Sequence, residues 1–291
     1  MSELFPLRHA RWDQPPSADV SATAWAALER GHVLYLPDLS FPIDAPAAAI
    51  FSPTVLTSSK NASFDPVSQR VGGTTLAGED LDRLRRLMTR WSDAAAALVG
   101  RLLPRYRGRV VRARSSFRPA EISGRVTSWR KDDTRLHVDS FPATPVQGRR
   151  ILRVFSNVNP SGRPRLWRIG GEFEVLASRF VDSLSVPWLG SAALLRVLGV
   201  TKSRRSDYDA LMLQLHDRMK ADADYQAAQP QTAVEFPAGT TWVAFTDQVS
   251  HASTAGQYQL EQTFVLPVEA LADESRSPLR ILERLKGRRL A

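Results

Sequence analysis

The sequence predicts an α+β fold whose core is a double-stranded β-helix (jelly roll), with flanking helices and a helical insertion. Three observations support this. Strand-like runs dominate residues 109–169 and 232–267, helical patterns fill the segment of about 171–228 between them, and no Pro/Gly/Ser-rich linker separates these parts. We therefore expect one domain spanning residues 1–291, with the helical insertion at about 171–228.

The expected elements follow from apolar periodicity and from the residues that end helices and strands. Helical patterns cover residues 21–30, 80–103, 172–184, 191–198, 206–226 and 278–290. Strand patterns cover residues 32–37, 109–117, 135–139, 150–158, 165–169, 232–236, 241–246, 250–252 and 259–267. Gly31 and Pro104 follow the first two helices directly, as residues that end helices do.

The composition is that of an ordinary soluble globular protein, with 43% hydrophobic and 24% charged residues. The absence of cysteine excludes disulfides, thiolate metal sites and cysteine nucleophiles. The N-terminal stretch lacks the apolar run of a signal peptide, and no stretch approaches the ~20 apolar residues that cross a bilayer. We expect a cytoplasmic protein that is soluble or at most peripheral to a membrane.

The positive charge is concentrated in one segment. The chain has a net charge of +9, yet residues 101–168 alone hold 17 Arg/Lys against four acidic residues. A general preference for arginine explains the type of basic residue but not the clustering. Such a field favours an anionic substrate, an anionic co-substrate or an acidic surface. Charge reversal at Arg149 or Arg150 is expected to weaken recognition of an anionic substrate, as high salt would.

A possible metal site combines His137 and Asp139 with the distant His251. His137 and Asp139 are two residues apart, so on a strand their side chains share a face. Two histidines and one carboxylate can occupy one face of an octahedral ion and leave three positions open, which suits a non-haem Fe(II) that also binds a co-substrate and O2. His-x-Asp also occurs by chance. The remaining histidines are expected to be structural or surface groups: His9, His32 and His216.

An Fe(II) oxygenase needs an electron donor, and a 2-oxo acid provides one by chelating the metal while a cation holds its far carboxylate. Arginine suits that role because its planar fork binds a carboxylate bidentately. Most oxygenases of this kind carry the arginine on the last strand, but residues 251–267 contain no Arg or Lys, and Gln262 occupies that neighbourhood. The anchor must come from elsewhere, and Arg118 and Arg153 are the candidates.

Four blocks of the sequence resemble the Kdo 3-hydroxylases, Fe(II)/2-oxoglutarate dioxygenases of Gram-negative bacteria that act on 3-deoxy-D-manno-oct-2-ulosonic acid (Kdo). The blocks are RLHVDSFP at 135–142, QGRRILRVFSNVNP at 147–160, LWRIG at 166–170 and DQVSHA at 247–252. The similarity extends over about residues 30–267. The first two blocks are long, which makes the resemblance specific.

The resemblance implies a dioxygenase that hydroxylates C3 of Kdo in Kdo-lipid A to give Ko, with release of succinate and CO2. It implies Fe(2+), 2-oxoglutarate and O2 as cofactor and co-substrates, with iron held by His137, Asp139 and His251. It also implies that 2-oxoglutarate is held by Arg118, Arg153 and Trp167. Kdo is acidic and lipid A carries phosphates, so the basic segment suits this substrate.

The basic C-terminal helix at 278–290 could hold such an enzyme at the anionic cytoplasmic face of the inner membrane, or could simply pack on the domain. Two other functions stay open. One is a 2-oxoglutarate oxygenase that acts on a protein side chain or a nucleobase. The other is a non-catalytic jelly-roll module that binds glycan or nucleic acid. The intact trio argues against a binding module, and no helix-turn-helix, RRM or zinc finger predicts a nucleic-acid partner. Homo-oligomerisation is also open.

Overall fold

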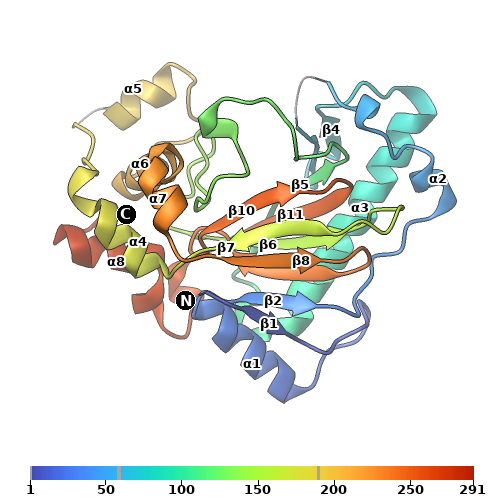
Figure 1. Cartoon of the computed structure of the whole chain (residues 1–291), viewed down its shortest axis with the longest axis horizontal. Helices are drawn as coiled ribbons and strands as arrows, with labels where there is room; N and C mark the ends of the chain where they lie inside the picture. The colour runs from blue at the N-terminus through green and yellow to red at the C-terminus, as the bar shows by residue number, and fades with distance from the viewer. Residues whose placement is uncertain (1, 58–59, 189–190) are drawn as a thin grey trace.

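The computed structural model describes residues 2–57, 60–188 and 191–291. Its strands form an eight-stranded sheet in the order β1-β2-β9-β6-β11-β5-β3-β4 and a three-stranded sheet in the order β10-β7-β8 (Figure 1). The large sheet consists of β1 (Leu4–Pro6), β2 (Val33–Leu36), β3 (Ala62–Asp65), β4 (Arg70–Gly72), β5 (Val111–Arg118), β6 (Arg150–Asn157), β9 (Thr241–Phe245) and β11 (Gln259–Leu266). The small sheet consists of β7 (Arg165–Ile169), β8 (Thr232–Phe236) and β10 (His251–Ala255).

The predicted jelly roll is confirmed. β5, β11, β6 and β9 pair antiparallel in the middle of the large sheet, and β10, β7 and β8 pair antiparallel in the small one. One expected strand is wrong in extent. Within 135–139 only His137 pairs as a strand residue, through an isolated bridge to His251. The metal-site segment is therefore mostly irregular backbone at the edge of the small sheet.

The helices cover the sheets on two sides. They are α1 (Ala18–Glu29), α2 (Ala45–Ala48), α3 (Gly78–Leu102), α4 (Phe173–Phe180), α5 (Ser191–Val197), α6 (Asp207–Ala221), α7 (Ala223–Ala228) and α8 (Pro278–Lys286). In Figure 1, α4 to α8 lie to the left of the sheets, while α1, α2 and α3 lie below and to the right. The predicted insertion corresponds to α4 to α7, which the chain places between β7 and β8. Among the described residues, no helix has the length and apolarity needed to cross a bilayer.

The long helix α3 forms because its apolar residues recur at helical spacing. Leu84, Leu87, Met88, Trp91, Ala95 and Leu98 are all buried. They pack in one core with residues from the outer face of the large sheet, including Leu152 of β6 and Leu260 and Phe264 of β11. Because side chains alternate along a strand, Arg153 of β6 and Glu261 of β11 point to the opposite, inner face. The inner face carries the site.

A second core lies between the two sheets and is mostly aromatic. Trp242 of β9 stacks on Phe155 of β6 and on Phe236 of β8, with ring centroids 5.3 and 4.0 Å apart. Trp167 of β7 meets both Phe155 and Trp242 edge-on. Such offset and edge contacts add to the free energy of burying these large rings. They fix the spacing of the two sheets beside the site.

Several element boundaries differ from the sequence-based expectation for local reasons. The single helix expected at 206–226 is divided at Asp222, whose side chain accepts a hydrogen bond from Tyr225 N and begins α7. The C-terminal helix ends at Lys286 because Gly287 adopts a left-handed conformation. The short elements β1, β3, β4 and α2 were not predicted. That the whole chain forms one domain stays a prediction.

Candidate active site

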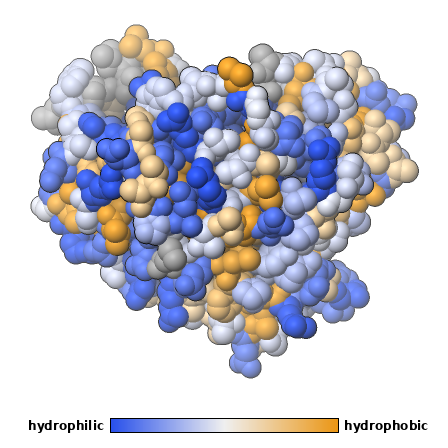
Figure 2. All heavy atoms as spheres, in the orientation of Figure 1, coloured by the Kyte–Doolittle hydropathy of each residue, from blue (hydrophilic) through white to orange (hydrophobic). Residues whose placement is uncertain are grey.

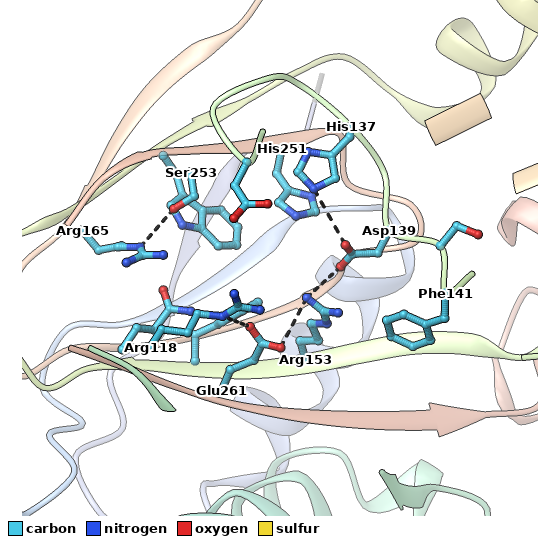
Figure 3. Close-up of a pocket in the computed structure, with 14 residues that line it drawn as sticks. Arg118, His137, Asp139, Phe141, Arg153, Arg165, His251, Ser253 and Glu261 are labelled. Carbon is cyan, nitrogen blue, oxygen red and sulfur yellow. Dashed lines mark hydrogen bonds and ion pairs between the residues drawn. The ribbon is translucent and has the colours of Figure 1, made fainter. Parts of the chain in front are cut away.

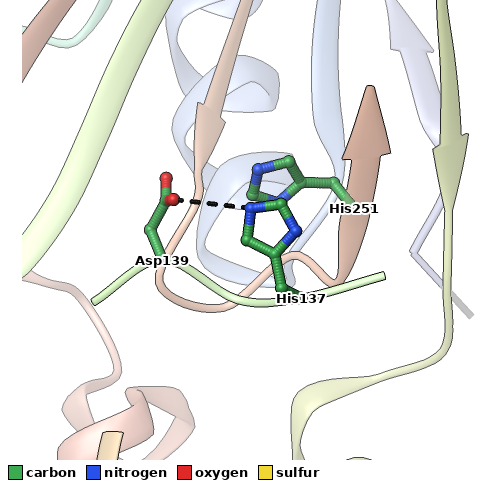
Figure 4. Close-up of side chains that lie close together, drawn as sticks. All are labelled: His137, Asp139 and His251. Atoms are coloured by element: carbon green, nitrogen blue, oxygen red, sulfur yellow. Dashed lines mark ion pairs between the residues drawn. The ribbon is translucent and has the colours of Figure 1, made fainter. Parts of the chain in front are cut away.

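The two histidines and the carboxylate come together as expected. One ligand atom from each of His137, Asp139 and His251 lies within 4.8 Å of the other two (Figure 4). His137 Nε2 lies 3.8 Å from Asp139 Oδ1. The imidazole centroids of His137 and His251 are 4.6 Å apart. This donor set and its compactness fit a single ion of the Fe(II) type.

Both imidazoles are held by backbone carbonyls. His137 Nδ1 lies 2.8 Å from Arg135 O, and His251 Nδ1 lies 2.8 Å from Val249 O. A carbonyl can only accept, so each Nδ1 carries the proton and each Nε2 keeps its lone pair for a metal. Burial lowers the pKa of both histidines below the ordinary value, so both are neutral at neutral pH.

The irregular segment that carries His137 and Asp139 is fixed at several points. His137 exchanges two backbone hydrogen bonds with His251, of 3.0 and 2.9 Å, and Asp139 N donates to Thr246 O. On the other edge, Gln226 of α7 replaces a neighbouring strand: its Oε1 accepts from Leu136 N at 2.8 Å, and its Nε2 donates to Leu136 O at 2.9 Å. The helical insertion thus takes part in building the candidate metal site.

A cavity of about 190 Å³ extends from the trio along the inner face of the large sheet. Figure 3 shows His137 and Asp139 towards one end, Arg165 and Ser253 towards the other, and Arg118, Glu261 and Arg153 below them. The wall also includes Asp133, Ser140, Phe141, Phe155, Trp167, His251 and Gln259. The cavity therefore has the candidate metal ligands at one end and three arginines, Arg118, Arg153 and Arg165, along the remainder.

Arg153 and Arg118 share one counter-ion in the cavity. Glu261 lies 2.9 Å from Arg118 Nε and 3.4 Å from Arg153 Nη1. Burial would raise the pKa of Glu261, but the two arginines lower it below its ordinary value, so the carboxylate is ionised. A buried guanidinium without such a partner would be costly. Glu261 thus holds both arginines in place.

Arg153 also contacts the carboxylate of the trio. Arg153 Nη1 lies 3.1 Å from Asp139 Oδ2. Burial would raise the pKa of Asp139, but the guanidinium of Arg153 holds it well below its usual range. Asp139 is therefore a carboxylate at every physiological pH, with one oxygen turned towards Arg153 and the other towards His137.

Arg165 is a buried cation whose hydrogen bonds go to neutral groups. Its side chain donates to Ser253 Oγ at 3.0 Å and to Gly256 O at 2.8 Å, and no carboxylate of the described residues forms an ion pair with it. Burial, followed by repulsion from Arg118, lowers the pKa of Arg165 to about 9, which leaves it charged at neutral pH. A buried cation at the cavity wall without an acidic partner is suited to bind an anion.

Two further polar atoms at the cavity wall lack hydrogen-bond partners. Among the described residues, none bonds Trp167 Nε1 or Gln259 Oε1, although both atoms are buried. Trp167 also stacks on His251, with ring centroids 5.0 Å apart. Buried polar atoms are normally satisfied, so unpaired ones at a cavity wall mark positions for a polar ligand.

Sequence reasoning placed six residues in the site, and the structure puts all six at this cavity: Arg118, His137, Asp139, Arg153, Trp167 and His251. It missed Glu261, Arg165 and Asp133. The residue of β11 that belongs to the cavity is Glu261, one position before Gln262. Strand alternation turns Gln262 away from the cavity, where it bonds Ser115, and turns Glu261 into it. The sequence signal that could have identified this residue is a glutamate, Glu261, inside a predicted strand. The structure shows that this strand is buried along its whole length.

Two expectations about other residues need correction. Arg150 is not a surface contact for an anionic substrate: it is fully buried, and its Nε lies 2.7 Å from Asp247 Oδ2. Arg149 donates to Val146 O and borders a hollow beside α8, away from the cavity. His216, which gave no sign of belonging to the site, lies edge-on to His137 with ring centroids 5.4 Å apart.

A jelly roll with two histidines and one carboxylate at the end of a cationic cavity defines the class of non-haem Fe(II) oxygenases. A family model described as 3-deoxy-D-manno-oct-2-ulosonic acid (Kdo) hydroxylase matches residues 11–289. The chain belongs to this Kdo hydroxylase family, which confirms the resemblance found in the sequence.

Solved structures of a Kdo hydroxylase, KdoO, a non-heme Fe(II) alphaketoglutarate-dependent dioxygenase, are similar along nearly the whole chain. The cobalt(II) complex has a TM-score of 0.96 at 46% identity and covers 99% of this chain and 97% of that one. The complex with alphaketoglutarate and Fe(III) has a TM-score of 0.96 at 45% identity, covering 100% and 98%. The complex with succinate and Fe(III) has a TM-score of 0.95 at 45% identity, covering 99% and 97%. No curated protein matches the chain.

Proposed function

We propose that this chain hydroxylates C3 of Kdo in Kdo-lipid A to give Ko, using Fe(II), 2-oxoglutarate and O2 and releasing succinate and CO2. The carrying observation is the placement of a two-histidine-one-carboxylate trio at one end of a buried cavity that is otherwise lined by arginines. Membership of the Kdo hydroxylase family supports the substrate.

In this proposal His137, Asp139 and His251 hold the iron. Bound iron and 2-oxoglutarate together supply O2 activation, so that one oxygen atom enters a C–H bond and the other enters succinate. The chain's own contribution is orientation. Backbone carbonyls fix the tautomer of both imidazoles, and Arg153 keeps the Asp139 carboxylate ionised and directed.

The cationic part of the cavity is the proposed site of 2-oxoglutarate. Arg118, Arg153 and Trp167 were expected to hold it, and all three border the cavity. We add Arg165, because Arg118 and Arg153 already share Glu261, whereas the hydrogen bonds of Arg165 go only to a hydroxyl and a carbonyl. A dicarboxylate between the trio and Arg165 would give Trp167 Nε1 the acceptor it lacks.

The sugar acid is proposed to enter over the trio and to meet the remaining charges at the cavity. The wall there combines Phe141 with Asp133, which Lys60 pairs at 2.9 Å. Lys60 and the nearby Arg125 supply positive charge for an acidic sugar. The lipid anchor of the proposed substrate supports a position at a membrane, and we propose the cytoplasmic face of the inner membrane.

The C-terminal helix is less suited to membrane contact than its sequence suggested. In α8 the apolar residues Leu279, Ile281 and Leu282 are buried in the protein core. Its arginines are paired, Arg280 with Glu274 and Arg284 with Glu174. Contact of α8 with a membrane stays a proposal, and it would involve only the charged side chains that face outward.

The proposed function is tested by measuring succinate release under air with Fe(II), 2-oxoglutarate and Kdo-lipid A. Mass spectrometry of the lipid should show a gain of one oxygen on Kdo, coupled one to one with succinate. Anaerobic titration should show 2-oxoglutarate binding only when metal is present. Succinate coupled instead to a protein or nucleobase substrate, with Kdo-lipid A untouched, would overturn the substrate assignment while keeping the oxygenase chemistry.

A further inference from the structure

We propose that the surface around α5 docks onto an anionic phospholipid bilayer and brings the cavity to a membrane-embedded substrate. The proposal rests on the proposed function, because a lipid-linked sugar requires the enzyme to work at a bilayer. We define the α5 surface by its exposed apolar residues and its cations: Trp188, Arg196, Val197, Leu198, Val200, Arg204 and Arg205.

The α5 surface gathers large apolar side chains that the protein leaves in water. The exposed fractions are 66% for Trp188, 83% for Val197, 65% for Leu198 and 52% for Val200. Figure 2 shows hydrophobic residues next to strongly hydrophilic ones at the upper left of the molecule, where Figure 1 places α5. Neighbouring exposed apolar residues of this size mark a contact surface, and tryptophan favours the bilayer interface.

The charges on this surface are of one sign. No aspartate or glutamate occurs between Asp182 and Asp207 in the sequence. The nearby Arg179 and Arg288 each pair with a carboxylate, whereas Arg196, Arg204 and Arg205 form no ion pair within the described part of the chain. Cations without a carboxylate partner beside apolar side chains complement an anionic lipid surface, at which each contributes to binding.

The surface is also hollowed. A cavity of about 600 Å³ opens there, with Trp188 and Val186 on its wall beside Arg204, Arg205 and Arg289. The wall also includes the carboxylate of Asp207, which is paired with Arg288. An aromatic and aliphatic wall with several guanidiniums can accept the phosphate and glycerol of a lipid headgroup. Contact with the flat surface of a bilayer alone would not require such a hollow.

The α5 surface is connected to the active site through the loop that follows Asp139. Lys202 N donates to Ala143 O at 3.0 Å, and Arg205 Nη2 donates to Pro142 O at 2.6 Å. The preceding residue of that loop, Phe141, borders the active-site cavity. A bilayer seated on the α5 surface would therefore lie beside the loop that borders the cavity.

Vesicle co-sedimentation tests the docking with the full chain. We expect binding to vesicles that contain phosphatidylglycerol and little binding to pure phosphatidylcholine. Two double variants, Val197→Asp/Leu198→Asp and Arg196→Glu/Arg204→Glu, should each weaken binding to the anionic vesicles at least about tenfold, because each basic residue near an anionic surface contributes about 1 kcal/mol.

Matched controls separate a surface effect from a general charge effect. Val175→Asp places one aspartate on α4, half the charge change of Val197→Asp/Leu198→Asp, at a valine that is 62% exposed in the same insertion. Arg107→Glu/Arg109→Glu makes the same change in net charge at exposed residues far from α5 in the sequence. Both controls should bind vesicles like the parent chain. Equal loss in the controls, or unchanged binding in the two α5 variants, would overturn the proposal.

Turnover distinguishes this proposal from the proposed function. The α5 variants should hydroxylate detergent-dispersed Kdo-lipid A at the parent rate and vesicle-embedded Kdo-lipid A at least about tenfold more slowly. If the parent chain hydroxylates neither form, the proposed function fails, while vesicle binding still tests the surface. If the parent chain is a dimer by light scattering and the α5 variants are monomers without any effect on vesicles, the surface binds a second copy and not a bilayer.

Discussion

The two chain segments that supply the proposed metal ligands are held in different ways. His251 opens β10, which pairs with β7 in an antiparallel ladder in which His251 faces Ile169 and whose register shifts only further along, between Ser253 and Ala255. His137 and Asp139 belong to irregular backbone that makes one bridge to β10 and otherwise depends on Thr246 O and the side chain of Gln226. One ligand thus comes with the fold, whereas the other two need long-range side-chain support.

The largest expected effect is loss of the metal itself. His137→Ala, Asp139→Ala and His251→Ala should each abolish turnover and metal retention, because three protein ligands leave no redundancy. Metal content after anaerobic loading, with circular dichroism as the control for folding, measures this. A variant that keeps both metal and full activity would remove its residue from the site.

Variants of Arg153, which contacts Asp139, and of Arg165, on the β10 side of the cavity, should distinguish effects on metal binding from effects on 2-oxoglutarate binding. Arg153→Ala should raise the KM for 2-oxoglutarate and also weaken metal binding, because Asp139 loses its cation. Arg165→Ala should raise the KM for 2-oxoglutarate without weakening metal binding, because Arg165 donates to Ser253 and Gly256 on the β10 side. Truncating one partner of a buried charge pair costs roughly 2–5 kcal/mol. Titration of each metal-loaded variant with 2-oxoglutarate gives the comparison, and an unchanged KM in Arg165→Ala would remove Arg165 from the co-substrate site.

Gln226 tests the irregular segment directly. Gln226→Ala leaves Leu136 N and O without their partner, and support of this kind is commonly worth 10–100-fold in metal affinity. The control is Gln214→Ala, which removes a similar pair of hydrogen bonds between a glutamine side chain and the backbone N and O of Ser185, elsewhere in the insertion. Metal affinity should fall for Gln226→Ala only. A similar fall in both variants would show that general loosening of the insertion is responsible.

The smallest expected effect is a pH dependence at the start of the irregular segment. Burial would raise the pKa of Asp133, but Arg118 and Lys60 lower it to about 2. A lowered folded-state pKa stabilises the protein above the ordinary pKa of about 4, and this contribution is lost as the pH falls towards 2. Asp133→Asn should lower the free energy of unfolding by about 1–2 kcal/mol at neutral pH and flatten its decline below pH 4, as measured by denaturant unfolding. A parallel decline in both proteins would contradict this role.

The same contrast explains what sequence reasoning could and could not find. The jelly roll was predictable because strand alternation is a local property, and His137 and Asp139 were noticed because His-x-Asp is a local spacing. His251 was added from its position in the expected strand order and from the resemblance. Arg165 looks like its many neighbouring arginines, and only the fold shows that it is buried without an acidic partner. Gln226 was invisible because its partner, Leu136, is 90 residues away in the chain. Contacts between a side chain and distant backbone follow no local pattern.

The role of Gln226 limits how this enzyme can be shortened or recombined. The helices between β7 and β8 look like an appendage that could be trimmed to a minimal jelly roll, or exchanged with those of a relative. Any such chimera must keep a glutamine at the position of Gln226, with α7 in the same register against Leu136. Exchange of the whole insertion would therefore also exchange Gln226 and α7, whereas a graft confined to residues 185–205 leaves the support of Leu136 in place.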